Sequence, residues 1–165
     1  MKDFYLKVKK LHKNARIDAP AKPGDVGHDV YAMETVRLEP GCRYAMPLGV
    51  ALEFPNGYGA FVEQRSGQAR HKGILTIGNV IDASYRGEIH AIIVNTSNDY
   101  TIVVNEGEKI AQVVFHKCFT VNNINYVDEL SNTERGDKGF GSTGIAFCHA
   151  GILHSDYELR ARRGI

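Results

Sequence analysis

Turn-forming residues interrupt this sequence at short, fairly even intervals, and this spacing restricts the chain to short secondary-structure elements. The turn signals are Pro23-Gly24, Pro40-Gly41, Pro55-Asn56-Gly57, Arg86-Gly87 and Asn105-Glu106-Gly107. Between them lie segments rich in β-branched and aromatic residues. Val50, Leu52 and Phe54 alternate with smaller or charged neighbours, and Ile102 and Val104 repeat that pattern. Many short strands at this spacing predict an all-β fold, either a barrel or a sandwich.

Three further segments complete the expected element list. Ile89–Val94 and Ile110–Phe115 are almost continuously apolar and predict more fully buried strands. Ser66–Lys72 is the one internal helix candidate, and it is short. No internal repeat or low-complexity segment is visible, and 165 residues correspond to one domain on the length prior.

The charge balance and composition argue against several classes of partner. The chain has 20 Lys and Arg against 19 Asp and Glu, so no basic excess favours nucleic acid or an anionic membrane surface. No apolar run is long enough to span a membrane, and Met1–Phe4 does not begin a signal peptide. We therefore expect a cytoplasmic protein with no nucleic-acid or membrane partner.

The cysteines and histidines indicate neither a disulfide framework nor a transition-metal site. Cys42, Cys118 and Cys148 are scattered, odd in number and without C-x-x-C spacing, which favours a reducing compartment. The seven histidines form no recognisable ligand pair.

The stretch GFGSTG, Gly139–Gly144, satisfies the letters of the dinucleotide-binding fingerprint but not its context. Only Ile145–Ile165 remain after it, which is too short for the required βαβ unit. A Walker phosphate loop also fails, because Ser142 stands where that motif needs lysine. Glycines beside Ser142 and Thr143 still suit phosphate oxygens, since bare backbone N–H groups can approach anions closely.

The stretch NVIDASYRGEI, Asn79–Ile89, has two possible interpretations. Asp82 can be an ordinary turn former in a β-hairpin. Alternatively, the segment forms a cupped hairpin whose backbone groups read a flat polar ligand, with Asp82 as a base and Tyr85 supplying a face. The residues alone leave both open.

Three other segments carry candidate polar groups with equally open roles. Ser66 stands where an N-cap hydroxyl and free helix N–H groups would bind an anion or simply cap the helix. Gln112 lies within an apolar strand, where a buried amide must find hydrogen-bond partners. Asp25 and Asp29 lie near a glycine turn, where carboxylates are ordinarily solvated.

The order of these segments resolves the ambiguity. GDVGHDVYA, RSGQA, NVIDASYRGE, GEKIAQVVF and RGDKGFGSTG follow one another, and together they closely resemble the five motifs of the homotrimeric dUTPase family. The resemblance covers about Asp18–Ile145, and the third and fifth motifs are highly specific.

The resemblance implies a β-jelly-roll in which three copies pack around a threefold axis and each active site draws on all three chains. It implies hydrolysis of dUTP at the α-phosphorus to dUMP and pyrophosphate, which limits uracil in DNA and supplies dUMP for thymidylate synthesis. Mg²⁺ would be bound mainly through the substrate triphosphate, with Asp29 at most an outer-shell contributor. We expect a core over residues 1–134, a mobile arm over 135–147, and an atypical tail over 148–165 that is frayed or disordered.

The family's site residues carry over onto matching positions. Asp82 would orient and deprotonate the attacking water, and Tyr85 would pack under the deoxyribose and exclude a 2′-hydroxyl. Gln112 would contact the α- and β-phosphates. The backbone of Asn79–Tyr85, with His90, would read uracil. The remaining nucleotide-binding positions are Arg65, Ser66, Gly67, Asn79, Val80, Ile81, Arg135, Phe140, Gly141, Ser142 and Thr143, of which Arg135 would bind the γ-phosphate and Phe140 would stack on the base.

The sequence departs from the family pattern at three positions within the region of resemblance. Asn79 replaces a common glycine, Gln64 a proline, and Gln68 an apolar residue. Two alternatives to a simple dUTPase remain: a dCTP deaminase of the same fold, and a dUTPase with an added nucleotide-dependent protein-binding role.

Overall fold

The computed structural model describes residues 4–138 and divides the chain into two units, Met1–Asn122 and Asn123–Ile165. The first unit contains all the secondary structure within the described residues. Its strands are β1 (Lys7–Lys10), β2 (His28–Tyr31), β3 (Val36–Leu38), β4 (Arg43–Pro47), β5 (Val50–Glu53), β6 (Tyr58–Gln64), β7 (Ile74–Ile77), β8 (Val80–Asp82), β9 (His90–Asn95), β10 (Ile102–Val104) and β11 (Lys109–Lys117). Helix α1 (Ser66–Lys72) joins β6 to β7. The all-β prediction with one short helix is confirmed.

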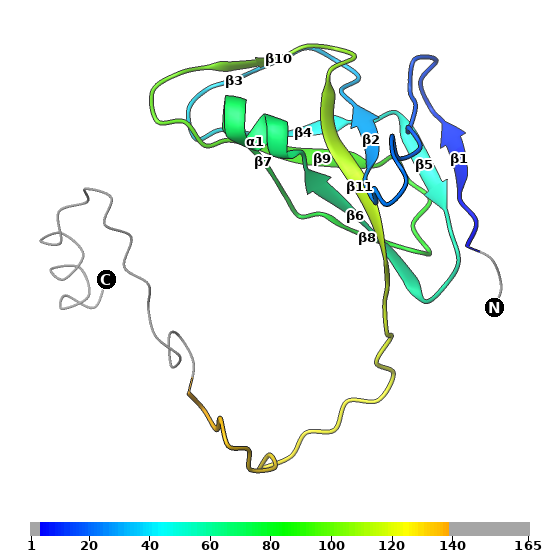
Figure 1. The fold of residues 1–165 in the computed structure, drawn as a ribbon, viewed down its shortest axis with the longest axis vertical. Helices are drawn as coiled ribbons and strands as arrows, with labels where there is room; N and C mark the ends of the chain where they lie inside the picture. The colour runs from blue at the N-terminus through cyan, green and yellow to red at the C-terminus, as the bar shows by residue number, and fades with distance from the viewer. Residues whose placement is uncertain (1–3, 139–165) are drawn as a thin grey trace, which may run out of the picture. The chain divides into compact units, whose positions relative to one another are not determined.

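The strands form four antiparallel sheets, with orders β1-β5, β10-β3, β2-β11-β6-β8 and β4-β9-β7. In Figure 1, α1 and the β3–β10 pair lie at one end of this unit, and β1 with β5 at the other. Fully buried aliphatic side chains from several sheets, including Val30, Met46, Val62, Ile93 and Val113, form one hydrophobic core. None of the helices among residues 4–138 has the length and hydropathy needed to span a membrane.

The alternation pattern predicted some strands better than others. In β10, Ile102 and Val104 are buried and Val103 is exposed, as expected. The expectation of a fully buried strand at Ile89–Val94 is wrong for this chain taken alone, because β9 alternates and Ile92 and Val94 are only half-buried. This face of β9 is apolar yet partly open to solvent.

A β-bulge in β11 positions two polar side chains. Lys109 pairs with Tyr31 of β2, and the register then shifts by one residue before Ala111 pairs with Val30 and Gln112 with Asp29. Without the shift, residues three apart would point to opposite faces of the sheet. The bulge allows Lys109 and Gln112 to line the same pocket.

Helix α1 has the predicted bounds but not the predicted cap. Arg65 is the N-cap residue, with extended backbone, and no side-chain hydrogen bond caps the helix. Ser66 is therefore the first helical residue and not the N-cap. At the other end Gly73 has φ 67°, a left-handed conformation that glycine adopts without strain, and its N–H closes the last turn.

The segment Asn79–Tyr85 is not a hairpin with β9. β8 pairs with β6, whereas β7 and β9 belong to another sheet. Gly78, at φ 61°, occurs where the chain leaves the β7 sheet for the β8 sheet. A turn follows β8, closed by a hydrogen bond from Tyr85 N to the Asp82 carbonyl at 3.0 Å.

The second unit is described only over 123–138, where no helix or strand occurs and the residues are exposed. Arg135 and Gly136 lie in a short turn region, in which Gly136 N donates to the Thr133 carbonyl at 3.1 Å. The first unit ends at Asn122. The division into a core over 1–134, an arm over 135–147 and a tail over 148–165 stays a prediction.

Candidate functional site

A polar pocket of about 560 Å³ gathers residues from the first, second and fourth motifs. Its polar side chains come from the loop before β2, from β2 itself, from the β6–α1 junction and from β11. They are Asp18, Asp25, Asp29, Arg65, Ser66, Lys109 and Gln112. We call this the phosphate half-site. Basic, hydroxyl and amide donors in one cavity suit a polyanionic ligand.

Asp29 holds the two cations of the phosphate half-site in place. Its Oδ1 accepts a hydrogen bond from Arg65 Nε at 2.8 Å, and its Oδ2 accepts one from Lys109 Nζ at 2.8 Å. The hydrogen bond to Asp29 raises the pKa of Lys109 above its usual value, so this side chain stays cationic at neutral pH. Asp29 therefore positions the positive charge of the half-site.

Asp18 links this arrangement to β2. It accepts a hydrogen bond from the Tyr31 hydroxyl and lies 3.6 Å from Lys109 Nζ. The Tyr31 hydrogen bond, assisted by Arg16 and Lys109, holds the pKa of Asp18 below its usual value despite partial desolvation. Asp18 is thus an anion at neutral pH that helps to fix Lys109.

Gln112 enters the pocket because Gly27 leaves room for it. A Cβ atom added to Gly27 would lie 1.9 Å from Gln112 Oε1 and 2.8 Å from its Cδ. The amide nitrogen donates to the Gln64 carbonyl at 3.1 Å. Gln112 is half-buried and lines the pocket, and Gly27 fixes where its amide lies.

A second, smaller pocket of about 270 Å³ contains the predicted base and sugar residues. Asp82, Tyr85 and His90 line it together with Val80 and Ile81 of β8. We call this the hairpin half-site, after the hairpin that the sequence predicted here. In the structure, the pocket lies between β8 of one sheet and β4 and β9 of another. Asp82 and Val80 are exposed and also line a neighbouring pocket of about 660 Å³.

The Tyr85 side chain is held in a defined orientation. Its hydroxyl donates to the Glu88 carbonyl at 3.0 Å. A Cβ on Gly87 would lie 2.3 Å from that hydroxyl, so only glycine permits this placement. The ring thus has a fixed polar end and an exposed face.

The side chain and carbonyl of Asn79 are engaged within the chain. Its Nδ2 donates to Glu63 Oε1 at 2.7 Å, and its carbonyl accepts from Val62 N at 2.9 Å. These bonds fasten the start of β8 to β6.

Within one chain the two half-sites lie far apart. Asp82 pairs with Gly59 at the start of β6, whereas Arg65 follows the end of β6, six residues further along. A strand rises about 3.3 Å per residue, so these positions are separated by about 20 Å along β6. Gln112 pairs with Glu63, on the opposite side of β6 from β8. A single chain therefore does not bring Asp82 to the phosphate half-site.

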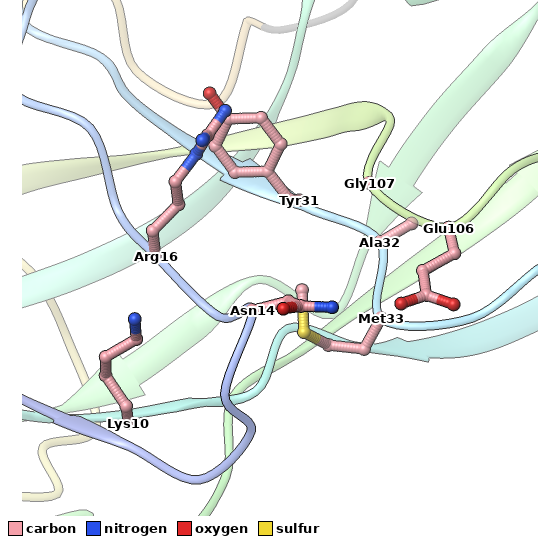
Figure 2. A pocket seen from close by; sticks show the side chains of 8 residues that line it. All are labelled: Lys10, Asn14, Arg16, Tyr31, Ala32, Met33, Glu106 and Gly107. Carbon is pink, nitrogen blue, oxygen red and sulfur yellow. The ribbon is translucent and has the colours of Figure 1, made fainter.

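A further pocket of about 620 Å³ is lined in part by Tyr31 and contains none of the predicted site residues (Figure 2). The Arg16 guanidinium lies 4.0 Å from the Tyr31 ring centroid, and Lys10, Asn14 and Glu106 complete the polar lining. The motif residues within the described part of the chain line the two half-sites and not this pocket.

Some predicted residues are not tested by these pockets. Phe140, Gly141, Ser142 and Thr143, together with the tail 148–165, lie outside the described residues. Arg135 belongs to the second unit, where its Nε donates to the Lys138 carbonyl at 3.1 Å. Its role toward a γ-phosphate stays a prediction.

No cluster of three or more His, Cys, Asp and Glu side chains among residues 4–138 is arranged to hold a metal ion. Both Asp29 oxygens already accept hydrogen bonds from cations. The donor set fits an ion carried by phosphate oxygens and water, the ligands Mg²⁺ prefers, better than an all-protein cage.

The described strands form an antiparallel β fold in which the motif residues lie in two separate polar pockets. A dUTPase family model matches residues 13–144. The chain belongs to the dUTPase family.

Individual relatives agree with this assignment. The chain is 41% identical over 152 residues to the deoxyuridine 5′-triphosphate nucleotidohydrolase of Syntrophotalea carbinolica, covering 88% of this chain and 100% of that protein. It is 42% identical over 139 residues to that of Leifsonia xyli, covering 82% of this chain and 90% of that protein. Among solved structures, a Staphylococcus bacteriophage 80alpha dUTPase with dUpNHpp matches with a TM-score of 0.77 and 30% identity, over 86% of this chain and 99% of that one.

A dUTPase of S. aureus phage phi11 matches with a TM-score of 0.70 and 28% identity, over 78% of this chain and 99% of that one, and is described as coordinating a structural Mg(II) ion.

Proposed function

We propose that this chain hydrolyses dUTP to dUMP and pyrophosphate in active sites that each combine the hairpin half-site of one copy with the phosphate half-site of another. Family membership supports the reaction. The proposal of a shared site rests on one observation, the separation of Asp82 from Arg65 and Gln112 along and across β6. A second copy is the simplest source of the missing half.

The phosphate half-site has the chemistry needed to bind and stabilise a triphosphate. Arg65 and Lys109 supply positive charge, Ser66 a hydroxyl and Gln112 an amide. Attack at a phosphorus atom places negative charge on the phosphate oxygens, and preorganised donors stabilise that charge. Since Asp29 already orients both cations, little reorganisation is needed when the ligand arrives.

The hairpin half-site has the chemistry needed to activate water and select the sugar. Asp82 is an exposed carboxylate that can accept a proton from a water aligned with the α-phosphorus. Tyr85, fixed at its hydroxyl by Glu88, presents a flat face for the deoxyribose. Close packing there would leave no room for a 2′-hydroxyl.

Mg²⁺ bound to the triphosphate would neutralise part of its charge and fix its conformation. Asp29 would contribute from the outer shell, through water, because its oxygens are committed to Arg65 and Lys109.

We infer a homotrimer from the resemblance of the motifs to those of the homotrimeric dUTPase family. The separated half-sites need at least one partner copy, and β9 has a half-buried apolar face that a partner could cover. Arg135 and the glycine-rich motif that follows would close each site from a chain in the same assembly.

The reaction is tested by measuring pyrophosphate release from dUTP, dCTP, dTTP and UTP side by side with Mg²⁺. We expect strong preference for dUTP. Ammonia release from dCTP would instead show a deaminase, and equal rates with UTP would remove the role given to Tyr85.

A further inference from the structure

Glu108, the residue immediately before β11, accepts hydrogen bonds from three donors. Its Oε1 accepts a hydrogen bond from Gln68 Nε2 at 2.8 Å and another from Lys72 Nζ. Its Oε2 accepts one from the backbone N–H of Asn105 at 3.3 Å. Two of these donors come from α1 and the third from the turn before β11. Glu108 thus ties the helix to the start of that strand.

Gln68 is the unusual member of this group. Only 8% of its surface is exposed, and its Nε2 also donates to the Lys109 carbonyl at 2.8 Å. Its Oε1 is buried without a partner among the described residues. Rotating the amide would place an oxygen against two acceptors, so the observed orientation is the better one. The two bonds donated by Nε2 therefore fix the position of the Gln68 amide.

These bonds join the two components of the phosphate half-site. Arg65 is the N-cap residue of α1 and Ser66 and Gly67 are its first two residues, whereas Lys109 and Gln112 lie on β11. Gln68 contacts Glu108 and Lys109 from within the first turn of α1. A helix of only seven residues has little stability of its own, so its position depends on such contacts.

We propose that Gln68 and Glu108 are positioning residues for triphosphate binding, which hold the Arg65–Gly67 turn at a fixed place relative to Gln112. This inference rests on the proposed function. It predicts that the Gln68 amide improves substrate affinity by fixing the position of α1 relative to β11.

The charge state of Glu108 supports this role. Burial raises the pKa of Glu108, but the hydrogen bonds from Lys72, Gln68 and Asn105 outweigh that effect and leave the pKa below its usual value. Glu108 is therefore ionised at neutral pH, and the hydrogen bond from Gln68 is charge-assisted.

The test is Gln68→Leu, which keeps the approximate size of the side chain and removes both the orphan oxygen and the two donated bonds. We expect KM for dUTP to rise about fivefold to tenfold, the loss that corresponds to one typical net hydrogen bond. We expect kcat to stay within about twofold, because the turn contacts phosphates in both the ground and transition states. Tm should change little, because the loss of the two donated bonds is offset by removal of the buried Gln68 Oε1. An unchanged KM would overturn the proposal.

Two further measurements separate this proposal from the proposed function. Amide hydrogen exchange over 65–72, which needs no activity, should be faster in the Gln68→Leu protein than in the wild-type protein. Unchanged exchange would contradict the positioning role even if dUTP is hydrolysed. Arg70→Gln, a change at an exposed position on the same helix, is the matched control and should leave both KM and exchange as in the wild type.

Discussion

At the scale of single residues, Asp82 is the proposed general base of the reaction. It is exposed at the end of β8 and lines the hairpin half-site. Asp82→Asn is nearly isosteric, so we expect the fold and nucleotide binding to persist while kcat falls by about 10²–10⁴, the usual contribution of a positioned base. Steady-state pyrophosphate release measures the fall in kcat, and calorimetry with a nonhydrolysable dUTP analogue checks that nucleotide binding persists. A wild-type kcat would show that Asp82 is not the base.

Tyr85 is expected to set the choice of sugar. Its ring has one anchored end, at Glu88, and an exposed face. Tyr85→Ala opens space for a 2′-hydroxyl and removes stacking area, so UTP should become a better substrate relative to dUTP while dUTP binds more weakly. The ratio of kcat/KM for the two nucleotides measures this. If the ratio does not change, another residue excludes ribose.

Gly27 controls the placement of Gln112. Because an added Cβ would overlap the Gln112 amide, Gly27→Ala should displace that amide and lower kcat/KM about tenfold or more. The same change in a Gln112→Ala background should have little effect, since no amide remains to displace. Additive losses in the double variant would show that Gly27 acts by another route.

At the scale of elements, the sequence predicted what depends on local pattern. Alternating Ile102 and Val104 identified β10, and the Ser66–Lys72 helix has the expected bounds. The bulge at Lys109–Ala111 and the separate sheets of β8 and β9 were not predictable, because register and sheet membership depend on long-range pairing.

The same limit applied to the site. Matching the family motifs found Asp82, Tyr85 and Gln112. The parts played by Lys109 and Gly27 become visible only from the residues that they contact in the structure, which are Asp29 for Lys109 and Gln112 for Gly27. Gly87 appeared in the sequence only as a turn signal. Gln68 was recognisable as a departure from the family, and its contacts with Glu108 and Lys109 give that departure a structural explanation.

Helix α1 should show a pH-dependent attachment to β11. The pKa of Glu108 is lowered in the folded protein, so its charged form contributes stability above its unfolded pKa of about 4.3 and loses that contribution as pH falls through the folded value. The Tm of Glu108→Gln should therefore lie below that of the wild type at pH 7, and the gap should narrow toward pH 3.5. Thermal unfolding across this range checks it, and a constant gap would contradict a role for the charge.

At the scale of the whole molecule, the account depends on two half-sites that one chain keeps apart. Asp82 and Arg65 flank opposite ends of β6, so the distance between them is built into the sheet and not into a movable loop. Rearranging loops would not bring them together. An assembly of several copies would bring Asp82 of one copy close to Arg65 of another. If such an assembly contains different variants, the number of complete active sites depends on which variants lie next to each other.

Mixing two inactive variants tests this most directly. Asp82→Asn lacks the base but keeps the phosphate half-site, and Arg65→Gln has the opposite defect. The two proteins are unfolded together in equal amounts, refolded, and assayed for pyrophosphate release from dUTP, beside each variant refolded alone. Random assembly should restore about a quarter of the wild-type rate, because half of each kind of half-site is intact and the two kinds meet at random. Activity no higher than the average of the separate variants, in a mixture shown to contain mixed oligomers, would contradict a shared site.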